Sequence, residues 1–316
     1  MKKLPLLLLF LFFPLIDKNT YHLDLMTNVC IYALLAMGLN VIVGSAGLLN
    51  LGYAAFFAIG AYTYALLNLN SGWSFWMALP VAGLASMIFG LVIGAPSIRV
   101  RGDYLAITTL GFGEIVRISL NNLDQFTGGP NGLLGIARPQ IFGYHFSVNP
   151  MPYFYLMLAL VAITAFLLFR LSDSKIGRAF VAIREDELAA SCMGVPVLQL
   201  KLTAFGLSSF IAGIAGACFA SKQTIVTPDS FDFVLSVLLL SMVVLGGMGN
   251  VWGAVLGALV LGVLPELLRS FASYRMLIFG LLMILMMIFR PQGILGGQLI
   301  RRELRPRQGR APDADA

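Results

Sequence analysis

The stretch Leu25–Asn68 reads LMTNVCIYALLAMGLNVIVGSAGLLNLGYAAFFAIGAYTYALLN and contains no Asp, Glu, Lys or Arg. It holds two long apolar runs, 25–43 and 51–68. Both runs approach the length of about 20 residues that a helix needs to cross the hydrocarbon core of a bilayer. Lipid offers no hydrogen-bonding partner to a bare backbone group, so such runs predict helices. We therefore expect two membrane helices joined by the short connection 44–50.

The composition of the whole chain agrees with this stretch. Of the 316 residues, 59% are apolar (AVILMFWYC) and 11% are charged, and the mean hydropathy is +0.87. A soluble domain carries roughly 25% charged residues. The composition excludes a secreted disulfide scaffold, a disordered chain, a coiled coil and a nucleic-acid-binding domain. It predicts an all-α polytopic membrane protein.

Ten apolar runs are candidate transmembrane helices, which predicts a bundle of about ten. Their residue ranges are 4–18, 25–43, 51–68, 75–95, 104–120, 152–170, 201–220, 232–248, 251–268 and 275–289. The run 4–18 follows Lys2 and Lys3 like a secretory signal, but no small-x-small cleavage site follows it, so we expect an uncleaved span. A count of eight or nine spans stays open if 4–18 or 104–120 does not cross.

The basic residues predict the orientation. Most of the 21 Lys and Arg residues fall in segments that are cytoplasmic if both termini are inside, as the positive-inside rule requires. The membrane domain is then 1–290. The basic segment 291–316 is expected to be a disordered cytoplasmic tail.

Small residues recur at every fourth position in three of the runs. The sets are Ala82, Ser86, Gly90 and Gly94; Ser209, Gly213 and Ala217; and Ala254, Ala258 and Gly262. Such stripes let helix backbones approach closely in lipid. They predict a tightly packed bundle, and a pore-lining role for one of the stripes is the lesser alternative.

Two glycine clusters end apolar runs, GSAG at 44–47 and GGMG at 246–249, and Asn50 and Asn250 follow them. Both clusters fit tight turns at the inner face or broken helices that line a pathway. The candidate pathway or gating residues in and beside these clusters are Asn40, Gly44, Gly47, Asn50, Gly246 and Gly249.

Glu114 is the one acidic side chain expected near the middle of the membrane. It lies 11 residues after Asp103, which corresponds to roughly 16 Å along a helix. Arg117 shares its helical face. A charge at that depth costs about 3 kcal/mol on insertion scales, so the pair should face the protein interior or water. The two interpretations are an ion pair that locks helices together and a pathway or gating role. Thr108 is a weaker polar candidate, as is Thr109.

The sequence lacks the common catalytic and metal-binding motifs. It has no G-x-x-x-x-G-K-[ST] loop, no H-E-x-x-H and no G-x-S-x-G, so we expect neither ATP binding by this chain nor hydrolase chemistry. It has two His and three Cys residues, none at metal-ligand spacing, so we expect no metal site. We therefore expect a protein that is not an enzyme, with no catalytic residue and no cofactor of its own.

The polar segment 171–200 is expected on the cytoplasmic side. Helix formers run from Arg178 to Met193, and Gly194 with the following Val-Pro is a stop signal. Phe180 and Ile183 share one face of this short amphipathic helix. The helix either connects two spans at the interface or docks a cytoplasmic partner.

At this helix the sequence resembles the permeases of ABC importers, and specifically the branched-chain amino acid permease family. The matching stretches are GLNVIVGSAGLLNLGYAAFFAIGAYTYALL (38–67), RVRGDYLAITTLGFGEIVRI (99–118), TGGPNGL (127–133), GRAFVAIREDELAASCMG (177–194), KLTAF (201–205), MVVLGGMGN (242–250) and FRPQGIL (289–295). The resemblance implies a multi-pass permease subunit in a bacterial inner membrane. It also implies a second homologous permease, two cytoplasmic ATPase subunits that bind ATP and Mg, and a periplasmic substrate-binding protein.

The resemblance also implies roles for two groups of residues. The segment 171–200, here named the coupling segment, would transmit ATPase motion through Arg178, Arg184, Glu185, Asp186, Glu187 and Gly194. The wider importer pattern has Glu-Ala-Ala where this chain has Glu-Leu-Ala-Ala at 187–190, so the match there is loose. The outer loop, about 121–151, is rich in Gly, Pro and Asn, and it would receive the binding protein through Gly128, Gly129, Pro130, Asn131 and Gly132.

The implied substrates are branched-chain or other hydrophobic amino acids. Members of the same family that carry urea or short amides are an alternative. An ion-coupled transporter acting alone, with Glu114 as its ion-coupling group, is less favoured. A membrane-embedded enzyme is disfavoured by the poverty of His, Asp and Glu in the spans.

Overall fold

The computed structural model describes residues 19–98, 100, 102–141, 144–145, 150–267, 275–290 and 293–295. The expected span 4–18 and most of the expected tail 291–316 lie outside these residues. The elements in chain order are α2 (Thr20–Asn40), the π-helix η1 (Val41–Ser45), α3 (Tyr53–Ser71), α4 (Phe75–Ser97), α5 (Asp103–Asn122), α6 (Asp124–Thr127), the 3-10 helix η2 (Gly129–Asn131), β1 (Leu133–Leu134), β2 (Gln140–Ile141), β3 (Tyr144–His145), α7 (Pro150–Asp173), α8 (Lys175–Glu185), α9 (Glu187–Cys192), α10 (Val197–Gln223), β4 (Ile225–Val226), the 3-10 helix η3 (Pro228–Phe231), α11 (Phe233–Gly246), α12 (Val251–Leu267) and α13 (Arg275–Phe289).

The protein is all-α apart from four very short strands among the described residues. A helix occupies each of the expected spans from 25–43 to 275–289. Within the described residues, five segments are long and apolar enough to cross a membrane: Thr20–Ser45, Phe75–Ser97, Met151–Asp173, Val197–Gln223 and Pro228–Gly246. The apolar helix Val251–Glu266 is shorter. The count of ten spans stays a prediction.

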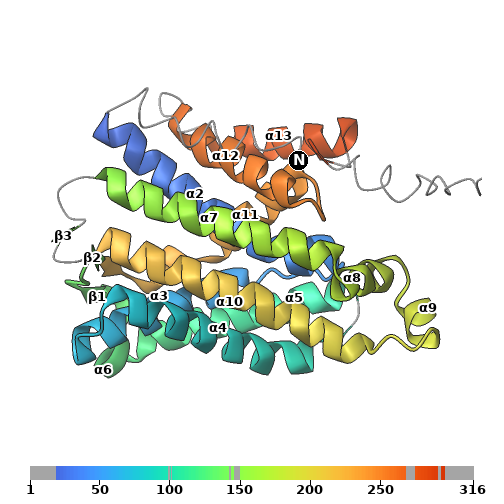
Figure 1. Cartoon of the computed structure of the whole chain (residues 1–316), viewed down its shortest axis with the longest axis horizontal. Helices are drawn as coiled ribbons and strands as arrows, with labels where there is room; N and C mark the ends of the chain where they lie inside the picture. Colours follow the sequence, from blue (N-terminus) through green and yellow to red (C-terminus); the bar gives the residue numbers. More distant parts are fainter. Residues whose placement is uncertain are drawn as a thin grey trace, which may run out of the picture.

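Helix α10 lies against both α3 and α4, and the small-residue stripes explain how the three backbones come so close (Figure 1). A Cβ added to Gly213 would lie 2.6 Å from the Ala82 carbonyl oxygen, and one added to Gly60 would collide with Gly213 itself. Ser86 Oγ donates a hydrogen bond of 2.8 Å to the carbonyl of Phe56. The predicted tight packing is confirmed for the stripes of α4 and α10.

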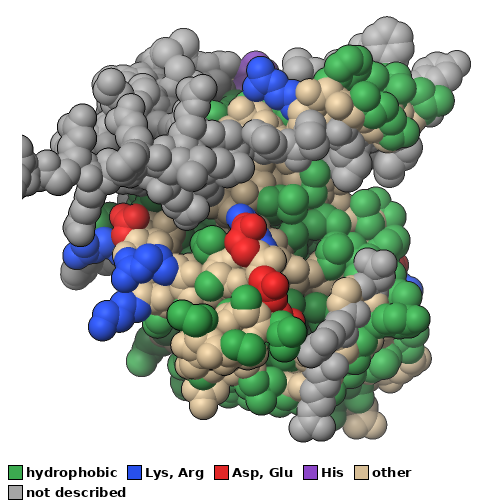
Figure 2. All heavy atoms as spheres, turned by 90° about the vertical axis from the view of Figure 1, so that its right-hand side faces the viewer, with side chains coloured by type: hydrophobic (Ala, Val, Ile, Leu, Met, Phe, Trp, Pro, Cys, Tyr) green, Lys and Arg blue, Asp and Glu red, His purple; other side chains and the backbone are tan. Residues whose placement is uncertain are grey.

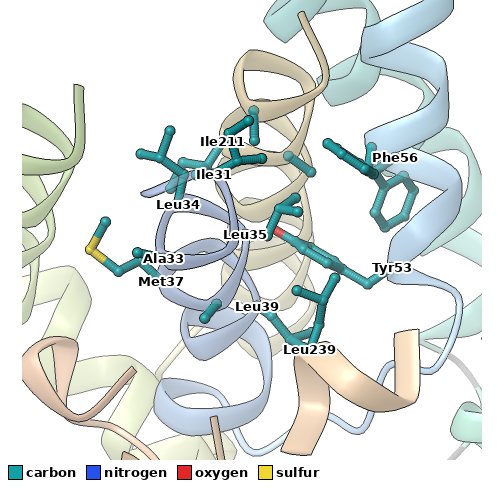
Figure 3. Packing of buried hydrophobic residues seen from close by; sticks show 14 of the residues in the cluster. Ile31, Ala33, Leu34, Leu35, Met37, Leu39, Tyr53, Phe56, Ile211 and Leu239 are labelled. Carbon is teal, nitrogen blue, oxygen red and sulfur yellow. The ribbon is translucent and has the colours of Figure 1, made fainter. Parts of the chain in front are cut away.

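Helix α2 runs through the interior and contacts α7, α10, α11 and α12. Its residues Ile31, Leu35 and Leu39 pack with Ile211 of α10 and with side chains of α3 and α11 (Figure 3). Ser208 Oγ donates a hydrogen bond of 2.6 Å to the carbonyl of Gly38. Lipid exerts no hydrophobic drive between helices, so close packing and hydrogen bonds of this kind hold the bundle together.

The short strands and the coupling segment lie at opposite ends of the bundle (Figure 1). At one end, named here the strand end, β1 pairs antiparallel with β4, and β2 pairs with β3. Helices α8 and α9 lie at the other end, named the coupling end. The loop expected outside and the segment expected inside are therefore separated by the length of the bundle.

Candidate functional site

The coupling segment is two helices, and the expectation of one continuous helix from Arg178 to Met193 is wrong. Helix α8 ends at Glu185, and α9 starts at Glu187. Between them Asp186 adopts an extended backbone conformation, and its Oδ1 accepts hydrogen bonds from the backbone N–H groups of Leu188 (2.9 Å) and Ala189 (3.0 Å). Because an aspartate cap satisfies the N–H groups at a helix start, Asp186 begins a new helix here.

Two cationic side chains hold the coupling segment to the bundle. Arg184 Nη1 donates a hydrogen bond of 2.9 Å to the carbonyl of Gly44. Lys201 of α10, whose side chain is only 4% exposed, pairs with Glu187 at 2.7 Å. Phe180 and Ile183 are buried beneath α8, as its amphipathic pattern predicts. Each helix of the segment therefore has its own polar attachment to the bundle.

The predicted charged centre of the segment already has partners within the chain. Glu185 pairs with Arg184 at 2.8 Å, while Asp186 and Glu187 make the contacts given above. Arg178 donates to the carbonyl of Asp173 at 3.0 Å, and Gly194 has the positive φ of +80° that its turn requires. Each of these charged residues therefore has a contact within the chain, and the side chains of Glu185 and Glu187 stay 69% and 39% exposed.

The coupling segment also exposes large apolar side chains. Leu188 and Met193 are 71% and 84% exposed. Figure 2 shows the coupling end face-on, with hydrophobic side chains beside a mixture of acidic and basic ones. An exposed apolar patch with a charged rim is typical of a protein–protein contact. The sequence analysis singled out the charged residues of this segment and did not consider Leu188 and Met193, and the role of the charged residues stays a prediction.

The two glycine clusters meet at the coupling end. Helix α2 ends in the π-helix η1, and Asn40 Oδ1, on the residue before η1, accepts a hydrogen bond of 2.8 Å from the N–H of Gly249. A Cβ on Gly44 would collide with both groups of that bond. Gly246 lies equally close to Gly253 across the α11–α12 turn. The sequence identified Asn40, Gly44, Gly246 and Gly249, and the structure brings them together.

Residues 293–295 lie against the same turn. The N–H groups of Ile294 and Leu295 donate to the carbonyls of Leu245 (2.9 Å) and Gly246 (3.1 Å). The Leu295 carbonyl accepts from Asn250 Nδ2 at 3.0 Å. This described part of the expected tail is therefore bound to the α11–α12 turn.

A second polar cluster surrounds the start of α3. Thr109 of α5 accepts from the N–H of Leu51 at 3.1 Å, and Ser236 of α11 accepts from the N–H of Ala54 at 3.1 Å. Asn50 is fully buried, and its Oδ1 accepts from the N–H of Gly52 at 2.9 Å. Side chains from three parts of the chain thus satisfy the N–H groups that a helix start leaves free. The sequence identified Asn50 but not Ser236.

Thr108 does not join this cluster. Its hydroxyl donates to the carbonyl of Tyr104 on its own helix at 2.8 Å. Thr109, one residue on, faces α3 and is 2% exposed. A rotation of about 100° per helical residue separates the two side chains. Gly47 lies at the coupling end, because it packs against Arg184 of α8. A Cβ at Gly47 would be 2.6 Å from Arg184 Cγ.

Glu114 and Arg117 form the ion pair that their spacing predicts, with an Nε–Oε2 distance of 2.9 Å. Both side chains are 32% exposed, and Arg117 also lies 3.6 Å from Asp229 of η3. The pair is therefore at the surface of this chain and is not locked inside its bundle. Ile115 and Ile118 are exposed beside it.

The predicted docking loop lies at the strand end. Gly128, Gly129 and Gly132 all have positive φ values, between 57° and 71°. Pro130 and Asn131 are exposed between them. Glycine tolerates this backbone conformation at little cost, so the three glycines shape a tight turn that presents Pro130 and Asn131 outward.

A bundle of apolar helices whose polar groups gather at helix breaks and at its two ends is the architecture of a polytopic membrane protein. The profile of the family described as "Branched-chain amino acid transport system / permease component" matches residues 21–287. The chain belongs to this permease family.

Named relatives of the chain are permease proteins of the same family. The chain is 46% identical over 315 residues to the high-affinity branched-chain amino acid transport system permease protein LivM of Escherichia coli (strain K12), covering 93% of this chain and 74% of that protein. The LivM protein of Salmonella typhimurium gives the same identity and coverage. The LivH permease protein of Escherichia coli (strain K12) is 25% identical, over 84% of this chain and 91% of its own length. No solved structure matches the chain.

Proposed function

We propose that this chain is a permease subunit of an ATP-driven importer for branched-chain amino acids, in a bacterial inner membrane with both termini cytoplasmic. Family membership and 46% identity to proteins named as branched-chain amino acid permeases support the substrate class. In this proposal the chain binds no ATP, and partner ATPases at the coupling end bind ATP and Mg. A substrate-binding protein docks at the strand end.

The proposed docking of the ATPase on the coupling segment rests on one observation, the exposure of Leu188 and Met193. The acidic side chains of the same segment have contacts within the chain. Burying such side chains against a partner is favourable by roughly 1.5–3 kcal/mol each. Arg184 and Lys201 attach the same segment to η1 and α10. A docked ATPase would then act on the bundle through these attachments.

The α5 surface supports a second permease as partner. A charged pair at membrane depth that is one-third exposed is costly against lipid. A protein surface or a hydrated pathway between two permeases would remove that cost. We therefore place the pathway along α5, between Glu114–Arg117 and the polar cluster at Asn50 and Thr109.

The test is purification of the tagged chain from native membranes in mild detergent. The expected result is recovery of a second permease and of ATPase subunits, with branched-chain amino acid uptake after reconstitution. Leu188→Asp combined with Met193→Asp should reduce ATPase recovery. Leu134→Asp, a matched change of an exposed leucine at the strand end, should not.

Three outcomes would overturn parts of the proposal. Uptake by the chain alone on an imposed ion gradient, abolished by Glu114→Gln, would replace it with a secondary transporter. Uptake of urea or short amides in preference to leucine would change the substrate class. Normal ATPase recovery with the Leu188→Asp and Met193→Asp variant would remove the docking role of α9.

A further inference from the structure

Arg184 and the turn between α11 and α12 are joined by a continuous set of contacts through Gly44 and Asn40. Arg184 Nη1 bonds the Gly44 carbonyl at 2.9 Å. Gly44 packs directly on Asn40 Oδ1 and on the backbone N of Gly249. Asn40 Oδ1 accepts from that same Gly249 N–H at 2.8 Å. The path crosses α8, η1 and the α11–α12 turn.

The π-helix makes the Gly44 carbonyl available. In η1 the N–H of Ala46 bonds the carbonyl of Val41 at 3.2 Å, and the N–H of Leu48 bonds that of Ile42 at 3.1 Å. The chain then leaves the helix at Gly47, which has a φ of +71°. The Gly44 carbonyl therefore lies in the last turn, where intrahelical partners run out, and Arg184 supplies its donor. Single π-turns in α-helices occur frequently at functional sites.

The backbones along this path are too closely packed to accommodate a Cβ at Gly44 or Gly47. A Cβ at Gly44 would collide with the Asn40 side chain and with Gly249. A Cβ at Gly47 would lie 2.6 Å from Arg184 Cγ. Closely packed interiors transmit a displacement because they have no free volume to absorb it. Helix α8, the π-helix and the turn are therefore in direct contact one after the other.

The α11–α12 turn is also hydrogen-bonded to the segment 293–295. Residues 293–295 bond Leu245, Gly246 and Asn250. A Cβ at Gly293 would collide with Gly247. The turn is thus in contact both with the π-helix and with residues 293–295.

We propose that Arg184 is a positioning residue that passes movement of the coupling segment, through the Gly44 carbonyl and the π-helix, to the α11–α12 turn at Gly249. The inference rests on the proposed function, since it assumes that an ATPase moves α8. It adds the path that the movement takes inside this chain. Three parts of the molecule, α8, η1 and the turn 246–250, then act as one unit.

The experiment uses the complete importer reconstituted in lipid, with three variants of this subunit. Arg184→Ala removes the bond to Gly44. Arg184→Lys keeps a cationic donor of similar reach. Arg170→Ala is the matched control, because Arg170 is an exposed arginine in the last turn of α7. The measured quantities are ATPase recovery, substrate transported per ATP hydrolysed, and hydrogen exchange of the backbone amides in 244–252.

For Arg184→Ala we expect unchanged ATPase recovery and a fall of about fivefold or more in substrate transported per ATP, the lower end of ordinary coupling between sites. Exchange in 244–252 should rise, because Gly44 packs against Gly249 of that turn. Arg184→Lys should recover most of the transport ratio. Arg170→Ala should leave both measurements at the wild-type level.

The inference is overturned if Arg184→Ala transports normally per ATP, or if it uncouples without any change of exchange in 244–252. It is equally overturned if Arg184→Ala only lowers ATPase recovery, because Arg184 would then serve docking and not transmission. Failure of the proposed function itself looks different. In that case the wild-type chain recovers no ATPase and shows no ATP-dependent uptake.

Discussion

Thr109 and Leu51 join α5 to the start of α3. The Thr109 hydroxyl accepts a hydrogen bond of 3.1 Å from the N–H of Leu51 and donates one of 3.0 Å to the carbonyl of Ala106. Gly52, the next residue, lies so close to the Thr109 carbonyl that a Cβ there would collide with it. The hydroxyl therefore satisfies a backbone group where two helices are in direct contact.

Replacing Thr109 with Val keeps the shape and removes the hydroxyl. The Leu51 N–H then loses its partner in a part-buried site, which costs about 1–3 kcal/mol. We expect Thr109→Val to lower the thermal midpoint of the detergent-solubilised permease. Thr108→Val, the neighbouring control, removes only a bond to its own helix and should change the midpoint little. Equal midpoints for the two variants would contradict the role of Thr109.

The approach of α3 and α4 to α10 predicts different costs for glycine substitutions. A Cβ at Gly213 would lie 2.6 Å from a backbone carbonyl oxygen, which cannot move aside. We expect Gly213→Ala to destabilise by about 2 kcal/mol, in the range of overpacking changes. The helical Gly111 has no atom within 4 Å of its Cβ position, so Gly111→Ala should be neutral or stabilising by up to about 1 kcal/mol. Thermal unfolding in the same detergent tests both, and a tolerated Gly213→Ala would show that the helices can move apart.

The ion pair between Lys201 and Glu187 predicts an asymmetry between its two partners. Lys201 is 4% exposed and Glu187 is 39% exposed. Glu187→Gln leaves a buried ammonium without its counter-charge, whereas Lys201→Met leaves a carboxylate that water reaches. We expect Glu187→Gln to be the more destabilising by about 2 kcal/mol, a value discounted for the exposure of Glu187. Chemical denaturation of both variants measures their free energies of unfolding. A larger loss of stability in Lys201→Met than in Glu187→Gln would contradict the burial of Lys201.

The cap at Asp186 predicts a local effect on α9. Asp186→Ala removes the acceptor for the Leu188 and Ala189 N–H groups, a loss of about 1 kcal/mol for typical N-caps. Hydrogen exchange should therefore accelerate in residues 187–192. Asp186→Ser, which restores a capping oxygen, should return the exchange toward the wild-type rate. Acceleration that spreads equally through α8 would indicate that the two helices unfold as one.

The natural cysteines test both the orientation and the docked surface. Cys192 is exposed at the end of α9, and Cys30 and Cys218 are buried. We expect a membrane-impermeant maleimide to label Cys192 in inverted vesicles and not in intact cells. Labelling should fall when the ATPase subunits are present. Labelling of Cys192 in intact cells would show that the coupling end lies outside, opposite to the proposed orientation.

The amino-acid sequence predicted the positions of the helices better than the contacts between them. Apolar runs locate helices because lipid forces every backbone group to bond within its own segment. The break at Asp186 was missed because helix formers lie on both sides of it. An Asp followed by Glu-Leu-Ala does carry the pattern of a helix start, which was the available signal.

The candidate functional residues were also easier to recognise in the sequence than the contacts that join them. The two glycine clusters were recognised separately, yet their meeting through Asn40 and Gly249 depends on how α2 and α11 pack, and no local pattern encodes that. Thr109 and Ser236 look like ordinary membrane-helix hydroxyls until the start of α3 is placed beside them. The Glu114–Arg117 pair was predictable from its three-residue spacing, but the one-third exposure of both side chains was not.

The pairing of β1 with β4 has a consequence for how the protein is made. Leu133 pairs with Val226, about 90 residues later in the chain. At ordinary rates of synthesis the ribosome needs roughly 5–20 s to cover that distance. During that interval β1 has no strand partner, while α7 and α10 are still being synthesised and inserted. The surface proposed to receive the binding protein is therefore completed late in biogenesis, so a subunit stalled or truncated before Val226 would reach the membrane without a finished docking face.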